Sequence, residues 1–180
     1  MEIERIFAEI SSHIIEGVMF HEQMSDYYDF LNLHGYKRCH EYHCRCEMKN
    51  LRKIHRYYIN HYNRLIQEDE IPNPKVIPSS WSKYARHEVD SGTKRTAVKD
   101  GIQRWYDWEK ETKEFLESKF VDLMNENEIA ASMKIKKLIR DVDHELKYAC
   151  RKMIELASVD YDMEYIQSEQ QRLHDKYKHR

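Results

Sequence analysis

Three ionisable residues interrupt the apolar face of predicted helices at positions where they could hold a metal ion. At about 100° per residue, His21, Glu47 and Glu109 each fall within a stripe of inward-facing side chains. Burying such groups costs several kcal/mol each unless they are paired or coordinated. The pattern therefore predicts either a polar site between helices or a buried hydrogen-bond network.

The composition is that of one helical domain spanning residues 1–180. The chain holds only four glycines and three prolines, and 34% of its residues are charged. Both features are typical of long helices, because glycine and proline are the residues that most disfavour a helix interior. A chain of this length is also long enough to bury a substantial core.

Charge, hydropathy and cysteine spacing indicate which partners and which cellular compartment to expect. The formal net charge of -2 and the pI near 6.6 argue against a dedicated nucleic-acid surface. No apolar run has the roughly 18 residues of a membrane span, and no signal-peptide pattern follows Met1. Three of the four cysteines crowd into residues 39–46, which suits reduced thiols. We expect a cytoplasmic protein with no nucleic-acid or membrane partner.

Helical periodicity predicts four long helices and a shorter fifth one. The predicted ranges are residues 2–32, 36–67, 94–125, 128–158 and about 160–178. Gly35 is the expected left-handed residue that closes the first helix. All three prolines lie in residues 68–93, which we interpret as a crossover with a short helical turn near residues 81–87. A long crossover is typical of bundles whose two middle helices run parallel.

Antiparallel pairing places the polar residues in one layer. With the first turn centred near residue 34, Glu47 lies level with His21. With the second turn centred near residues 126–127, Glu109 lies level with His144 or Glu145. Each hairpin thus sets one glutamate beside a His-Glu dipeptide. Inward carboxylates and imidazoles on facing helices form metal sites in bundles, and oxygen-rich ligation suits iron or manganese.

Three segments resemble helices of the ferritin-like superfamily. Residues 97–120 are similar to the third helix, whose metal-binding glutamate maps to Glu109. Residues 138–147 are similar to the fourth helix, whose carboxylate and second ligand map to Asp141 and His144. Residues 46–54 resemble the Glu-x-x-His phrase of the second helix, with Glu47 at its start and Asn50 in place of the histidine.

The resemblance implies an all-α, ferritin-like four-helix bundle with a long crossover between helices two and three and a short fifth helix. It also implies a homo-oligomer that binds iron or manganese, as an oxidase or in iron storage. The family's first-helix glutamate maps near Glu16, whereas the layer geometry favours His21 or Glu22. The complete set of candidate ligands is His21, Glu22, Glu47, Glu109, Asp141, His144 and Glu145. On the fourth helix, the inner phase favours Glu145 over His144.

Two alternatives stay open at the level of sequence. Cys39, His43 and Cys46 share one helical face, and with Cys150 they could bind a softer metal such as zinc. The polar layer could also be a hydrogen-bond network that includes tyrosines and Asn50. In that case the protein would be a non-catalytic bundle with a degenerate site that acts in protein–protein interaction or oligomerisation.

Overall fold

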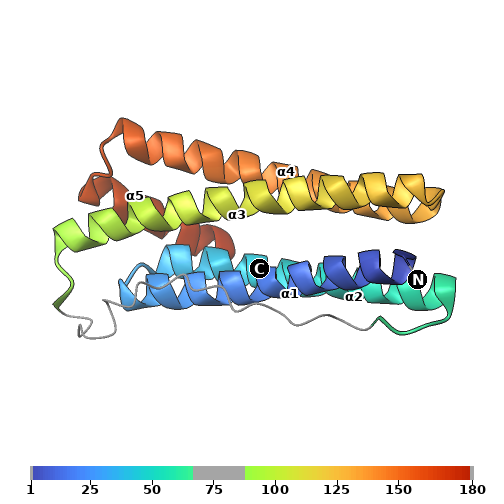
Figure 1. Ribbon diagram of the computed structural model, residues 1–180. Helices are drawn as coiled ribbons and strands as arrows, with labels where there is room; N and C mark the ends of the chain where they lie inside the picture. The colour runs from blue at the N-terminus through green and yellow to red at the C-terminus, as the bar shows by residue number, and fades with distance from the viewer. Residues whose placement is uncertain (1, 67–87, 179–180) are drawn as a thin grey trace.

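Five α-helices account for nearly all of the chain that the structure describes (Figure 1). The computed structural model describes residues 2–66 and 88–178, and no strand occurs in these ranges. The helices are α1 (Glu2–Phe30), α2 (His34–Tyr62), α3 (Ser91–Asn125), α4 (Ile129–Ser158) and α5 (Met163–Tyr177). In Figure 1, α1 and α2 form one pair and α3 and α4 form a second, while α5 packs against α2. The predicted all-α bundle is confirmed.

The first helix ends differently from the prediction. Asn32, not Gly35, takes the left-handed conformation, with φ of 57°. The Leu33 amide donates to the Tyr28 carbonyl at 2.9 Å, and the Asn32 amide donates to the Asp29 carbonyl at 3.0 Å. These two bonds form a Schellman motif, in which asparagine is the usual substitute for glycine. The turn therefore comes a few residues earlier than expected.

Gly35 has a different task, which sequence periodicity does not reveal. It lies in the first turn of α2, where α5 crosses. A Cβ atom at this position would lie 1.7 Å from the carbonyl oxygen of Gln170. Only glycine lets the two backbones approach so closely.

Aspartate caps fix where α3 and α5 begin. The Asp90 carboxylate accepts the Thr93 amide at 2.6 Å, and Asp162 accepts the amides of Glu164 and Tyr165 at 3.0 Å each. Of the predicted crossover 68–93, residues 91–93 already belong to α3. Residues 68–87, including the expected turn at 81–87, lie outside the described residues.

The core divides into two clusters along the bundle. The aromatic cluster lies beside the α1–α2 turn and α5, and its members include Phe20, Tyr27, Tyr28, Tyr36, Trp105 and Trp108. The aliphatic cluster lies toward the start of α1, and its members include Ile6, Ile10, Ile14, Leu116, Leu123, Ile135 and Leu138. The polar residues of interest fall where these two clusters meet.

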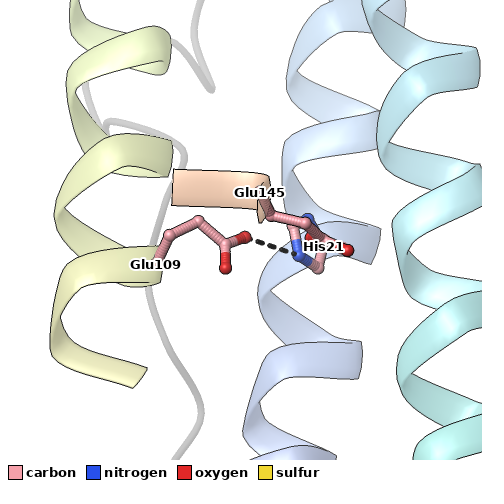
Figure 2. A group of neighbouring side chains, drawn as sticks. All are labelled: His21, Glu109 and Glu145. Atoms are coloured by element: carbon pink, nitrogen blue, oxygen red, sulfur yellow. Dashed lines mark ion pairs between the residues drawn. The ribbon is translucent and has the colours of Figure 1, made fainter. Parts of the chain in front are cut away.

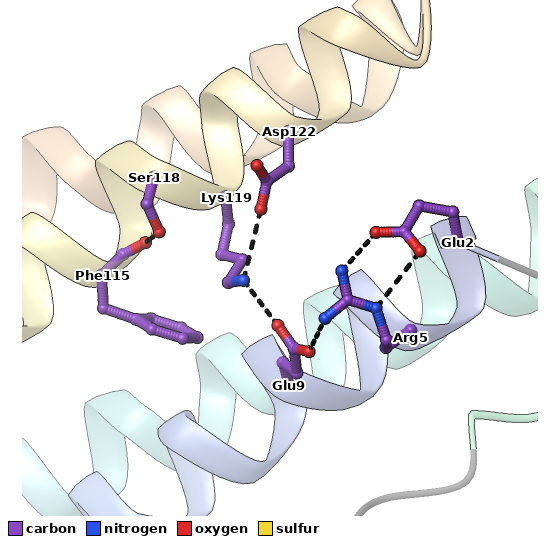
Figure 3. Close-up of polar contacts among 7 residues, drawn as sticks. All are labelled: Glu2, Arg5, Glu9, Phe115, Ser118, Lys119 and Asp122. Carbon is purple, nitrogen blue, oxygen red and sulfur yellow. Dashed lines mark hydrogen bonds and ion pairs between the residues drawn. The ribbon is translucent and has the colours of Figure 1, made fainter.

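Ion pairs join α1 to α3 beside the aliphatic cluster (Figure 3). Lys119 on α3 pairs with Glu9 on α1 at 2.5 Å and with Asp122 at 3.3 Å. Arg5 pairs with both Glu2 and Glu9. Of these contacts, the Lys119–Glu9 pair joins the two hairpins, and the others lie within α1 or α3. Within residues 2–66 and 88–178, none of the helices has both the length and the hydropathy that crossing a membrane requires.

Candidate metal centre

Three helices bring His21, Glu109 and Glu145 together in the bundle interior (Figure 2). One ligand atom from each residue lies within 4.8 Å of the other two. His21 and Glu109 are 0% and 2% exposed, and His21 Nε2 lies 3.7 Å from Glu109 Oε1. Figure 2 shows the Glu109 carboxylate of α3 pointing toward the His21 ring of α1. Residues far apart in the sequence thus converge on one point.

Helix α2, which contributes no ligand to this group of three, adds two more imidazoles beside it. His40 Nδ1 lies 3.0 Å from His21 Nδ1, so one of these nitrogens donates a proton to the other. His43 Nδ1 forms an ion pair with Glu145 Oε2 at 2.9 Å. Trp105 Nε1 donates to Glu109 Oε1 at 3.0 Å. Every side chain of the group is therefore held by a neighbour from another turn or another helix.

Burial and neighbouring groups together shift the pKa values of the three imidazoles. Burial lowers the pKa of His21 and His40 well below the ordinary value, so both rings are neutral at pH 7. Burial also lowers the pKa of His43, but the Glu145 carboxylate and the Cys39 thiol more than offset this, and the net pKa is raised. The neutral imidazole is the form that binds metals.

The carboxyl groups of Glu109 and of nearby Glu47 both have raised pKa values. Burial raises the pKa of Glu47 to about 8, with a further contribution from Glu145 and an opposing one from His43. Burial and the charges of Glu145 and Glu47 likewise raise the pKa of Glu109 well above the ordinary range. These carboxyl groups hold protons at pH values where exposed glutamates are ionised, and a bound cation would replace those protons.

Glu47 lies one layer away from His21. A Cβ atom on Gly17 would lie 3.6 Å from Glu47 Cγ and 3.3 Å from Trp108 Cζ2, so α1 presents a glycine where we expected His21. The shift follows from the earlier α1–α2 turn. Asn50 forms a hydrogen bond with Glu47 and accepts one from Lys53 at 3.2 Å. Asn50 thus supports the Glu47 carboxyl group, whereas a histidine at this position could have been a second ligand beside Glu47.

The residues fit a metal ion of the first transition row. His21 Nε2 and His40 Nε2 are buried and form no hydrogen bond within the described residues. Leaving such atoms unpaired costs about 1–3 kcal/mol each. Donor atoms bound to one ion at about 2.0–2.2 Å lie within about 4.4 Å of one another. A small closing movement of His21, Glu109 and Glu145 would therefore satisfy a common ligand.

The other predicted residues lie outside this group. Glu22, Asp141 and His144 are exposed on their helices, although Asp141 and His144 line a surface pocket next to Glu145. Glu16 is half-buried, and burial together with nearby Glu111 raises its pKa.

His40 was not predicted from the sequence, and His43 was predicted to lie beside Glu47 without binding the metal, or to belong to the alternative softer site. Their i, i+3 spacing places both rings on one helical face, and this signal could have pointed to the pair. In the described chain, the thiols of Cys39 and Cys46 do not join any cluster of metal-binding groups.

Comparison with known proteins rests on structure. No protein-family model matches the chain, and no curated protein matches it in sequence. A humanized archaeal ferritin matches with a TM-score of 0.79 and 13% identity, over 94% of this chain and 93% of that chain. A closed form of Archaeoglobus fulgidus ferritin, engineered by mutagenesis, gives 0.74 and 12% over 94% and 93%. An open-pore ferritin from the same hyperthermophilic archaeon gives 0.73 and 12% over 94% and 92%.

The chain has the ferritin-like fold. The match extends over nearly the full length of both chains, so the predicted ferritin-like bundle with its short C-terminal helix is confirmed. At 12–13% identity the likeness shows the fold alone. What the ferritin-like bundle does must be argued from its own residues.

Proposed function

We propose that this ferritin-like chain binds iron or manganese between His21, Glu109 and Glu145, and that it oxidises or stores iron. The observation that carries the proposal is the convergence of three ligand atoms from three helices within 4.8 Å. Two carboxylates and an imidazole form an oxygen-rich set, which suits these metals better than zinc. Iron at this position would supply one-electron chemistry between its ferrous and ferric states.

The surrounding residues support the proposal by preparing the ligands. If His21 donates its Nδ1 proton to His40, its Nε2 lone pair faces Glu109 and is free to bind a metal. A second partner that fixes the tautomer in this way is typical of metal-binding histidines. Trp105 orients Glu109, and His43 orients Glu145. Glu47 adds a third carboxylate whose raised pKa a cation would lower.

Metal analysis tests the proposal. Protein purified without chelator is assayed for iron and manganese by mass spectrometry, and Co²⁺ titration follows the ligand field by absorption. We expect about one metal ion per chain, and loss of most of it in Glu109→Gln and Glu145→Gln. Glu111→Gln is the matched control, because Glu111 is exposed on the same helix as Glu109. Unchanged metal content in both site variants would refute the proposal.

Gly17 and Asn50 favour one alternative, a non-catalytic bundle that acts through its surface. The layer that contains Glu47 receives no carboxylate from α1, because Gly17 lies there. This alternative predicts no bound metal and a thermal stability that is indifferent to added Fe²⁺ or Mn²⁺. The expected homo-oligomer and cytoplasmic location stay predictions, which light scattering and cell fractionation would test.

A further inference from the structure

A second pocket lies between α2 and α4, and no residue of the metal centre lines it. Its volume is about 470 Å³, within the range of small-molecule sites. It lies between the C-terminal half of α2 and the N-terminal half of α4, beside the aliphatic cluster. Several cationic side chains line the pocket, and the proposed metal chemistry does not use them.

Both walls of the pocket carry cations. Lys53 and Arg56 come from α2, and Lys134 and Lys137 come from α4. Asp141 is the acidic residue in the lining, so the local charge is about +3 in a chain whose formal net charge is -2. Arg56, Lys134 and Lys137 form no hydrogen bond or ion pair with other residues of the described chain. Cations crowded around a concave surface attract anions more strongly than the same charges spread apart.

The floor of the pocket is apolar and aromatic. Ile54 and Leu138 belong to the aliphatic cluster and line its base. The Tyr57 ring lies beside them, with the Lys134 ammonium 5.6 Å from its centroid and the His61 ring stacked at 5.4 Å. A ligand that fits must therefore combine negative charge with a flat or apolar body.

We propose that this pocket binds a small phosphate monoester whose aromatic or apolar part lies on Ile54, Tyr57 and Leu138. Arg56 can bind phosphate oxygens with two parallel N–H donors, and the lysines add point charges from both walls. A dianion matches the surplus positive charge better than a monocarboxylate does. The short basic lining favours a small molecule over a nucleic-acid strand, which needs a longer cationic surface. This site is independent of the proposed metal function.

Isothermal titration calorimetry with three probes tests the two halves of the proposal. The probes are 1-naphthyl phosphate, inorganic phosphate and 1-naphthol, each titrated into the full chain. We expect 1-naphthyl phosphate to bind at least about tenfold more tightly than either other probe, because only it meets both the cations and the apolar floor. Equal binding of inorganic phosphate would overturn the apolar half, and equal binding of 1-naphthol would overturn the anionic half.

Charge-reversal variants test whether the residues named above bind the phosphate. Lys137→Glu and Arg56→Glu should each weaken 1-naphthyl phosphate binding about tenfold or more, the effect of losing a charge-assisted hydrogen bond. Lys136→Glu and Arg52→Glu are matched controls, since both residues are exposed on the same helices but do not line the pocket. Equal losses in controls and site variants would overturn the assignment. Lys137→Gln repeats the test without a new negative charge, and circular dichroism checks the fold.

Discussion

The two ends of the bundle interior differ in what they bury. In the aliphatic cluster, Ile6, Ile10, Leu123 and Ile135 are 0% exposed and present only hydrocarbon to one another. Where the aromatic cluster begins, His21 and His40 are equally buried, and they lie among rings such as Tyr28 and Trp105. One bundle interior therefore contains an apolar region and a region of buried ionisable groups within a few helical turns of each other.

This difference separates the residues that stabilise the bundle from those of the proposed metal site along the helix axes. Burying aliphatic side chains contributes about 1.5–3 kcal/mol each, whereas burying ionisable groups without full pairing is unfavourable. Aromatic residues with polar tips suit the boundary because they fill volume and still offer hydrogen bonds, as Trp105 does to Glu109. The aliphatic end can hold the bundle together while the polar layer stays available for a ligand.

The largest expected effect comes from the aliphatic end. Leu123→Ala removes a fully buried side chain and leaves a cavity, so it should lower the free energy of unfolding by about 2–5 kcal/mol. Urea denaturation measures this loss. Metal binding should be unchanged under conditions where the variant is folded. A loss below about 1 kcal/mol would contradict the assignment of stability to this end.

A comparable but metal-dependent effect is expected at the polar layer. At a free metal concentration of 100 times the dissociation constant, wild-type protein should gain about 2.7 kcal/mol of stability. Glu109→Gln should lose this gain, because the amide still accepts from Trp105 but cannot supply a carboxylate ligand. Without metal, the variant should be as stable as wild type or up to about 1 kcal/mol more stable. Thermal unfolding with and without Co²⁺ measures both quantities, and an equal Co²⁺ gain in the variant would count against the site.

A smaller effect should appear with pH in the metal-free protein. The folded-state pKa of Glu47 is raised to about 8, so the folded chain keeps a proton that the unfolded chain loses near pH 4.5. Stability should therefore fall as pH rises through this range, and the contribution of Glu47 between pH 6.5 and 8 is at most about 2 kcal/mol. Urea denaturation between pH 6.5 and 8 measures this slope, to which Glu109 and His43 also contribute because their folded-state pKa values are raised as well.

Glu47→Gln should make the pH dependence of stability less steep, and Glu22→Gln should leave it unchanged because Glu22 is exposed. A slope as steep in Glu47→Gln as in the wild type would assign the whole effect to Glu109 or His43.

The smallest effect is expected at Gly17, on the boundary between the two ends. Alanine is favoured over glycine in a helix by about 1 kcal/mol, but the new Cβ would lie 3.3 Å from Trp108 Cζ2. The two terms oppose each other, so Gly17→Ala should change stability by less than about 1 kcal/mol. Gly92→Ala is the control, because a Cβ there meets only Asp90 Oδ1, at 3.4 Å, and should stabilise α3. A larger gain at Gly17 than at Gly92 would show that Trp108 moves aside easily.

Much of the fold could be predicted because helices follow local rules. Few glycines and prolines, a 3.6-residue apolar period and turn residues between periodic stretches were enough to place the helices within a few residues of their observed ends. The exception at Gly35 has a long-range cause. Gly35 suggested a helix end, yet its absent side chain serves a contact with Gln170, which lies 135 residues further along the chain.

The sequence by itself determined that polar groups such as His21 and Glu109 face the interior, since helical phase depends on residue spacing alone. Only the tertiary structure decided which of them meet. A shift of a few residues in the α1–α2 turn moved Glu47 beside Gly17 and brought His40 and His43 to the layer of His21. Register between helices depends on the turn geometry and on how the hairpins pack, and neither is encoded in the period of a single helix.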